Sequence, residues 1–335
     1  MNNFFQLSIE DKQHVLQQAS ARLGLPPQAI EKDLWVTTIL QIVFTLPFSD
    51  KLIFKGGTSL SKVWHQIERF SEDIDLAVDR SLFGMEGDLT KKQSKKLRKV
   101  SSLFVREDFC PALKKGIEQY GLSALCTIEP QPDGEGDNTY PEPRKVFVKY
   151  QSAWAEPIEY LSPVVMLEIG ARSLLEPNEQ TNIHSMVEEL FPTIQTTLVD
   201  SQVATALASK TFLEKAFLLH ELFSVEGRGE IAERKSRHLY DLSRMMDKDF
   251  AWDAINDDEL WESIRHHREV FTSVRGMDYT PDVRKRIVLV PPSEIQAAWE
   301  QAYKSMCSSM IFGGKPTFKE LLERMHELEK RFHNV

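Results

Sequence analysis

The sequence predicts an α+β protein, in which a mixed sheet flanked by helices is followed by a mostly helical C-terminal lobe. Short apolar runs that suit buried strands are interspersed with helical patterns in the first part of the chain. Beyond Pro177 the strand patterns give way to helical ones for most of the remaining sequence. A chain of 335 residues is long enough for two domains. We therefore expect residues 1–198 to form a domain of N-terminal helices and the sheet, and residues 199–335 to form a helical domain.

Composition and net charge exclude several classes of protein. Hydrophobic residues make up 41% of the chain and charged residues 27%, as in ordinary soluble proteins. The net charge of −9 argues against a uniformly basic nucleic-acid binder, although a local basic patch remains compatible with it. The three cysteines show no metal-ligand spacing and their odd number opposes a disulfide framework, so we expect a cytoplasmic protein. The N-terminus has neither a basic segment nor a long apolar run, and we expect no signal peptide and no membrane span.

Two helices are predicted at the N-terminus. The first spans residues 8–23, with Ser8 as its N-cap and acidic residues in its first turn. The second spans residues 28–46 and carries apolar residues at helical spacing. Its start reads Glu31-Lys-Asp-Leu-Trp-Val. The polar residues there either cap and pair as structural groups, or direct Lys32 or Asp33 into an active cleft.

The central stretch is residues 55–76, KGGTSLSKVWHQIERFSEDIDL, preceded by a short apolar run that suits a buried strand. Two glycines break the chain, a helix is expected over residues 58–66, and a strand follows at residues 71–76. Alternation along that strand puts Asp73 and Asp75 on one face. Adjacent carboxylates repel each other unless a cation lies between them, and oxygen ligands suit Mg²⁺ or Mn²⁺. A glycine turn that leads into a helix also suits phosphate. Together these features indicate a nucleoside-triphosphate site, against the alternative of a hairpin with a solvated acidic face.

The rest of the first domain is expected to contain one long helix and three strands. The helix spans residues 91–120, and its basic start at residues 91–99 either clamps an RNA backbone or is a solvated face. Strands are expected at residues 122–129, 145–150 and 164–169. Glu168 lies among apolar residues of the last strand, so it needs a metal or a partner such as Arg172.

In the C-terminal domain a helix is expected at residues 203–223, with Lys215 close to its apolar face. Lys215 either extends to solvent or reaches into a cleft. A second helix follows with Arg234, Arg237 or His238, and Asp241 on one face. An arginine–aspartate pair there either fixes the helical lobe against the sheet or belongs to a site. The amphipathic helix of residues 318–332 packs on this lobe or on a partner.

The central stretch resembles the nucleotidyltransferase motif of the DNA polymerase beta superfamily, a glycine turn followed by an Asp-x-Asp strand. It is most similar to the AbiEii/AbiGii toxin family, which includes MenT-like toxins and carries Gly-Gly-Thr-x-Leu-Ser-Lys and then Arg-x-Ser-x-Asp-Ile-Asp-Leu. The matching residues are Gly56, Gly57, Thr58, Leu60, Ser61, Lys62, Arg69, Ser71, Asp73, Ile74, Asp75 and Leu76. Residues 31–36 and 234–242 resemble two further segments of that family.

This resemblance implies a nucleotidyltransferase fold for the sheet and a role for each candidate residue. Metal ligands would be Asp73, Asp75 and Glu168, which hold one or two Mg²⁺ (or Mn²⁺) ions that also bind the triphosphate of an NTP. Phosphate-binding residues would be Gly56, Gly57, Thr58, Ser71, Lys215 and Arg237. Asp241 would orient Lys215 or the bound nucleotide. In some related toxins the serine that matches Ser71 is modified, and a phosphate there would repel the incoming nucleotide.

The resemblance also implies a metal-dependent toxin of a type IV toxin–antitoxin or phage-defence system. Such a protein would transfer NMP from an NTP to an RNA acceptor, such as the 3′ end of tRNA, with release of pyrophosphate. It would have a cognate antitoxin. Two alternatives stay open: a nucleotidyltransferase that modifies a protein or a small molecule, and a GTP-binding regulatory module without transfer activity.

Overall fold

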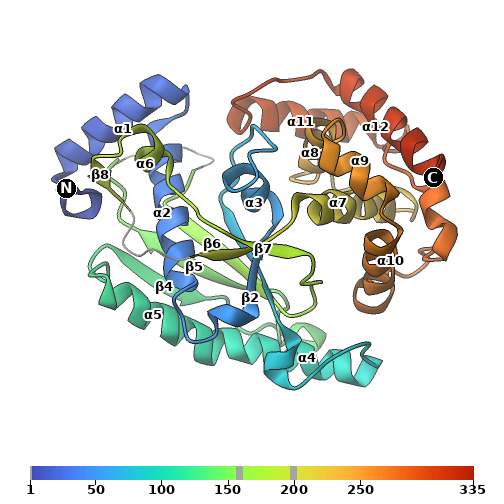
Figure 1. Ribbon diagram of the computed structural model, residues 1–335, viewed down its shortest axis with the longest axis horizontal. Helices are drawn as coiled ribbons and strands as arrows, with labels where there is room; N and C mark the ends of the chain where they lie inside the picture. The colour runs from blue at the N-terminus through green and yellow to red at the C-terminus, as the bar shows by residue number, and fades with distance from the viewer. Residues whose placement is uncertain (1, 156–160, 197–201) are drawn as a thin grey trace. The chain divides into compact units, whose positions relative to one another are not determined.

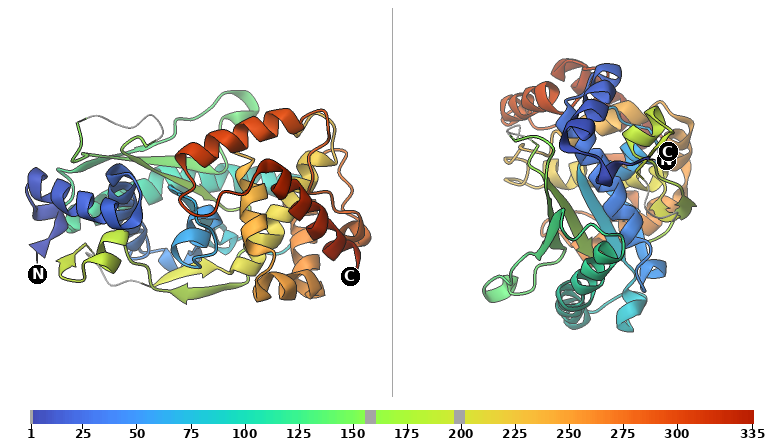
Figure 2. Two further views of the ribbon diagram at one scale, coloured as in Figure 1. Left: turned by 90° about the horizontal axis from the view of Figure 1, so that it is seen from above. Right: turned by 90° about the vertical axis from the view of Figure 1, so that its left-hand side faces the viewer.

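The computed structural model describes residues 2–155, 161–196 and 202–335 (Figures 1 and 2). The chain forms two compact units, and the prediction of an α+β fold is confirmed. The first unit comprises Met1–Val63 and Phe70–Ala206, and it contains the sheet. The second comprises Trp64–Arg69 and Leu207–Val335 and is mostly helical. The domain division at residue 198 stays a prediction. No helix among the described residues is long and apolar enough to cross a membrane.

The first unit is built on a seven-stranded sheet in the order β4-β5-β6-β3-β2-β9-β7 (Figure 1). The β3/β6 and β2/β9 pairs are parallel and the other pairs are antiparallel, so the sheet is mixed. Its strands are β2 (Leu52–Lys55), β3 (Asp73–Val78), β4 (Cys126–Pro130), β5 (Arg144–Tyr150), β6 (Val164–Gly170), β7 (Asn178–Thr181) and β9 (Val203–Ala206). A separate pair joins β1 (Asn2–Asn3) to β8 (Ile194–Gln195).

Helix α2 is the centre of the helical layer of this unit. It contacts α1, α5, α6 and the strands β3 and β6, and every residue from Ala29 to Val43 is buried. Its centre and end are mostly apolar, as a helix buried on all sides requires, and the charged residues near its start are buried with partners. The helices of the unit are α1 (Ile9–Leu23), α2 (Pro27–Val43), α3 (Gly56–Lys62), α4 (Lys91–Phe104), the π-helical segment η4 (Val105–Phe109), α5 (Cys110–Gln119) and α6 (Met186–Leu190).

Several expected elements differ from the structure. The helix predicted from Val203 is wrong for its first residues, because β9 is a buried strand paired with β2, and the helix begins only at Ala208. Val203 and Thr205 are β-branched, and pairing with a neighbouring strand outweighs the helical pattern that follows them. The long helix of residues 91–120 contains a π-helical turn just before Pro111, which has no N–H for a regular helical bond. Helix α3 ends earlier than expected, at Lys62. The strands expected from residues 71 and 122 begin only at Asp73 and Cys126. Arg234, expected on the helix of Asp241, precedes α8 and has a φ of +60°, which a helix does not allow.

The second unit packs its helices around α7, most of whose side chains are buried. Its aromatic core includes Phe217 and Trp261, whose ring centroids lie 4.5 Å apart. Helix α12 contacts α8 and buries its apolar face, so it packs on the helical lobe rather than remaining free for a partner. The helices are α7 (Ala208–Phe223), α8 (Arg237–Met245), α9 (Asp249–Asn256), α10 (Asp258–His267), η6 (Arg268–Thr272), η7 (Pro281–Arg286), α11 (Gln296–Ser309) and α12 (Phe318–His333).

Candidate active site

The glycine turn places the backbone of Gly56 close to the carboxylate of Asp75. Gly56 follows β2 directly, opens α3, and has a φ of +85°, which L side chains rarely adopt. A Cβ atom at this position would lie 2.1 Å from Oδ2 of Asp75. Only glycine therefore allows the turn to approach the Asp75 carboxylate so closely. Gly57 is the next residue of α3.

The hydroxyl groups beside the turn bond to each other and to the strand. Thr58 is 1% exposed, and its hydroxyl donates to the backbone carbonyl of Asp73 and lies 2.9 Å from Oγ of Ser71. These contacts tie the start of α3 to the start of β3. The assignment of Thr58 and Ser71 to phosphate stays a prediction, and in this structure the Thr58 hydroxyl is engaged within the protein.

The candidate carboxylates lie on one face of adjacent strands. Asp75 of β3 is directly opposite Glu168 of the parallel strand β6. Asp73 precedes Asp75 by two residues and therefore points to the same face. On the other side Asp75 faces Lys55 of β2, and Glu168 faces Lys145 of β5. A row of four charged residues thus crosses four strands, with the two acids in the middle (strands in Figure 1).

Glu168 has a lysine counterion in this structure. Nζ of Lys145 lies 3.1 Å from Oε1 of Glu168, and both side chains are partly exposed. Arg172, the other expected partner, instead donates to the backbone carbonyl of Glu142. No group of three His, Cys, Asp or Glu side chains within the described ranges stands ready to hold a metal ion. The donor set still fits magnesium, since Asp73, Asp75 and Glu168 offer only oxygen atoms on a shared face. Lys145 therefore competes with a metal ion for the Glu168 carboxylate.

Helix α2 supports both ends of the turn-and-strand segment. Lys32 is 3% exposed and forms an ion pair with Glu72, the residue just before Asp73. Its neighbour Asp33 lies 2.6 Å from Nζ of Lys62, at the end of α3, and accepts a hydrogen bond from the backbone of residue 186. The polar start of this helix therefore has structural partners, as the first of the two interpretations requires. Because buried ion pairs are costly unless well satisfied, these contacts fix α3 and β3 at defined positions.

The second unit contains a buried charge cluster around Asp241. Arg69 donates two hydrogen bonds to the Asp241 carboxylate, at 2.6 and 2.8 Å, and Lys215 lies 2.9 Å from it. Asp241 is fully buried and Arg69 nearly so. Burial alone would raise the pKa of Asp241, but Arg69 and Lys215 outweigh it and hold that pKa below its ordinary value. Nδ1 of His238 lies 3.4 Å from Nζ of Lys215.

Burial also lowers the pKa values of Lys215 and His238. For Lys215 the attraction of Asp241 opposes the effect, and for His238 the positive charges of Lys215 and Arg237 add to it. His238 is therefore neutral at pH 7. Asp241 forms an ion pair with Lys215, and its expected task of orienting Lys215 or the bound nucleotide stays a prediction. Arg237 is the first residue of α8 and is partly exposed.

The structure thus places Asp73, Asp75 and Glu168 on one face of two adjacent strands of the first unit, and it pairs Lys215 with Asp241 in the second; their roles in a site stay predictions. Two contacts were missed in the sequence. Lys145 as the counterion of Glu168 was detectable in principle, because both lie in strands with alternating patterns. Arg69 as the partner of Asp241 had no local signal, since the two are 172 residues apart.

A mixed sheet with an Asp-x-Asp strand beside a glycine turn is typical of the nucleotidyltransferase class. The family model described as "Nucleotidyl transferase AbiEii toxin, Type IV TA system" matches residues 39–324. The chain belongs to this family of AbiEii nucleotidyl transferase toxins.

Two solved structures are similar to this chain over most of its length. MenT4, a nucleotidyltransferase toxin from Mycobacterium tuberculosis H37Rv, is 16% identical with a TM-score of 0.47, and the match covers 97% of this chain and 98% of that one. JHP933 from Helicobacter pylori is 13% identical with a TM-score of 0.41, and the match covers 92% of this chain and 94% of that one. A search of curated protein sequences gave no significant match.

Proposed function

We propose that this protein transfers a nucleoside monophosphate from an NTP to an RNA acceptor, the 3′ end of tRNA, and releases pyrophosphate. The observation that carries the proposal is the pair of carboxylates Asp75 and Glu168 at facing positions of parallel strands, with Asp73 on the same face and the Gly56 turn against Asp75. Membership of the AbiEii family supports the reaction class and a cognate antitoxin. The protein is proposed to act in the cytoplasm, within a type IV or phage-defence system.

In this proposal Asp73, Asp75 and Glu168 hold Mg²⁺ or Mn²⁺. Such an ion, when bound, lowers the pKa of the acceptor hydroxyl and neutralises charge on the leaving pyrophosphate. The acceptor oxygen forms a bond to the α-phosphorus while the bond from that phosphorus to the β-phosphate bridging oxygen breaks. The hydroxyl proton passes to solvent.

The chain's own groups then orient the triphosphate. Backbone N–H groups of the turn at Gly56 and Gly57 donate to phosphate oxygens, and Thr58 and Ser71 lie beside them. Ser71, if phosphorylated, would repel the nucleotide. Lys215 and Arg237 are proposed as further phosphate-binding residues, with Asp241 holding Lys215 in place. The ion pair of Lys215 with Asp241 supports this role, because the Asp241 carboxylate opposes the lowering of the Lys215 pKa by burial.

The test is to incubate the purified protein with each α-labelled NTP, Mg²⁺ and total tRNA. Label in the RNA that depends on Mg²⁺ supports the proposal. Label in protein or in a small molecule would support the first alternative, a transferase with another acceptor. Retention of GTP without any transfer would support the regulatory-module alternative and contradict the proposal.

A further inference from the structure

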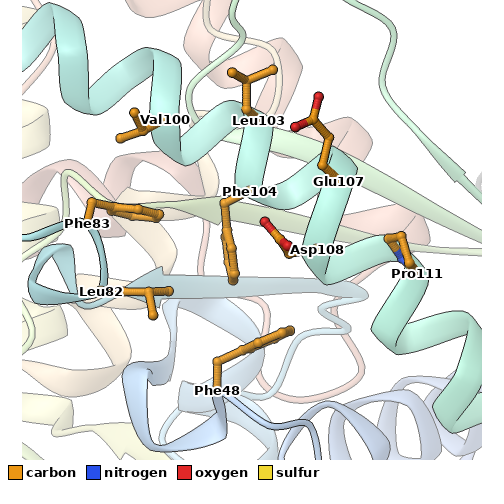
Figure 3. A pocket seen from close by; sticks show the side chains of 9 residues that line it. All are labelled: Phe48, Leu82, Phe83, Val100, Leu103, Phe104, Glu107, Asp108 and Pro111. Atoms are coloured by element: carbon orange, nitrogen blue, oxygen red, sulfur yellow. The ribbon is translucent and has the colours of Figure 1, made fainter.

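The surface of the first unit carries an apolar groove of about 690 Å³ (Figure 3). The ring of Phe104 forms its floor, with ring centroids 5.0 Å from Phe48 and 5.6 Å from Phe83. Leu82, at the edge, is 38% exposed. Figure 3 shows these side chains converging below α4 and η4. The apolar and aromatic side chains at this groove are only partly covered by the chain itself, so they can contact an apolar surface of another molecule.

The helix that forms one wall of the groove changes from basic to acidic residues along its length. Val100, Leu103, Phe104, Glu107, Asp108 and Pro111 all line the groove, so they share one face of the continuous α4–η4–α5 helix. Lys92 and Lys96 extend the same stripe toward the N-terminus at four-residue spacing. The stripe is therefore basic at one end, apolar in the middle and acidic at the other end.

The charged ends of this stripe are available for a partner. Lys92, Lys96 and Asp108 are exposed, and none of the three forms an ion pair within the part of the chain that the structure describes. Glu107 is paired with its neighbour Arg106, at 2.7 Å, where both are exposed to solvent. Exposed pairs of this kind contribute little free energy and can exchange partners.

We propose that this stripe is the interface of a symmetric homodimer, in which α4 of one copy lies antiparallel to α4 of a second copy. A twofold axis at the level of Ser102 places Val100 opposite the second copy's Phe104. Lys96 lies six residues before that level and Asp108 six residues after it, so each Lys96 faces an Asp108 of the other copy. At an α-helical rise of about 1.5 Å per residue Lys96 is about 9 Å from the axis, and Asp108 is slightly nearer because the π-helical segment η4 rises less per residue. The surface is thus complementary to itself, which a twofold interface requires.

The same pattern disfavours an RNA strand as the occupant of the whole stripe. RNA suits the basic end at Lys92 and Lys96, but the acidic end at Glu107 and Asp108 repels phosphate and the apolar middle offers it no charge. A second copy of the protein complements the basic end, the apolar middle and the acidic end of the stripe. The apolar contact supplies most of the affinity, and the charged ends set the antiparallel orientation.

The experiment is sedimentation velocity of the full-length protein at about 1 to 200 µM, a range suited to a small interface. We expect a monomer–dimer equilibrium. Lys96→Asp and Asp108→Lys should each raise the dimer dissociation constant about tenfold, because each variant faces two like-charge pairs across the axis. The double variant restores opposite charges and should return the constant to within about threefold of wild type. Leu103→Asp, at a partly exposed position, should raise it about a hundredfold.

Lys91→Asp is the matched control, since it makes the same charge change on a different face of the same helix. It should leave the equilibrium unchanged, and circular dichroism checks that each variant is folded. A wild-type protein that stays monomeric throughout the range overturns the proposal. So does a dimer that the two single charge reversals do not weaken, or one that the double variant fails to restore. RNA binding lost equally in the Lys96→Asp and double variants, with no dimer present, would assign the stripe to nucleic acid.

Discussion

Replacing Gly56 with alanine tests the close approach of the turn to Asp75. The new Cβ would lie 2.1 Å from Oδ2 of Asp75, whereas an ordinary contact needs at least 3.4 Å. The carboxylate must therefore move by about 1 Å, and a displacement of that size at a reacting centre costs roughly a hundredfold in rate. The positive φ of Gly56 adds about 1–2 kcal/mol of backbone strain.

Gly121 provides a matched control for the backbone strain. Its φ is +73°, and a Cβ there would meet nothing within 4 Å. Gly121→Ala should thus lose about 1–2 kcal/mol of stability without losing transfer activity. We expect Gly56→Ala to lose at least about a hundredfold in the rate of label transfer, measured at saturating NTP, while remaining folded by thermal denaturation. If Gly56→Ala transfers label at the wild-type rate, as Gly121→Ala should, then the position of the Asp75 carboxylate does not matter for catalysis and the reasoning is wrong.

Three other predictions follow from ion pairs and pKa values. Lys32→Met leaves Glu72 unpaired beside the Asp-x-Asp strand, so urea denaturation should give a loss of about 3 kcal/mol, partly restored by adding Glu72→Met. Lys145→Met frees Glu168 and removes a nearby positive charge, so Mn²⁺ titrated by electron paramagnetic resonance should bind about threefold to tenfold more tightly. Lys149→Met, on the same strand but paired elsewhere, should leave Mn²⁺ affinity unchanged. His238 has a lowered pKa when folded, so unfolding takes up a proton below pH 6.5 and acid destabilises the protein. His238→Gln should therefore lose about 1 kcal/mol less stability per pH unit between pH 6.5 and 5.

Each of these predictions can fail separately. A Lys32→Met protein as stable as wild type would mean that the ion pair to Glu72 does not hold β3. Equal Mn²⁺ affinity in the Lys145→Met and wild-type proteins would mean that Lys145 does not compete for Glu168. An unchanged slope of stability against pH in His238→Gln would assign the acid sensitivity to other groups, such as the buried His220, whose pKa burial lowers to about 4.

The turn-and-strand segment was predictable because its signals are local. The glycines at residues 56–57 break the chain, and alternation from Asp73 places both aspartates on one face, as the structure confirms for the strand. The positive φ of Gly56 also follows from its residue type. What no local pattern contains is the contact of Gly56 with Asp75, which depends on how the strands β2 and β3 pair.

Contacts between distant segments were the part that sequence could not supply. The facing positions of Asp75 and Glu168 depend on the register of two strands separated by most of the domain. Helical spacing predicts a partner for Asp241 on its own helix, but Arg69 lies far earlier in the chain. The sequence does not distinguish β9 from the start of the following helix, because four residues are too few to set a period and only pairing with β2 defines them as a strand.

The most direct test of the account is Mg²⁺-dependent transfer of α-labelled NMP to RNA by wild type, Asp73→Asn and Glu129→Gln. Glu129 is an exposed acid on β4 of the same sheet, so its replacement controls for the loss of one negative charge. The account predicts that Asp73→Asn loses at least about a thousandfold in rate while Glu129→Gln stays at the wild-type rate. Equal rates for Asp73→Asn and wild type would contradict it.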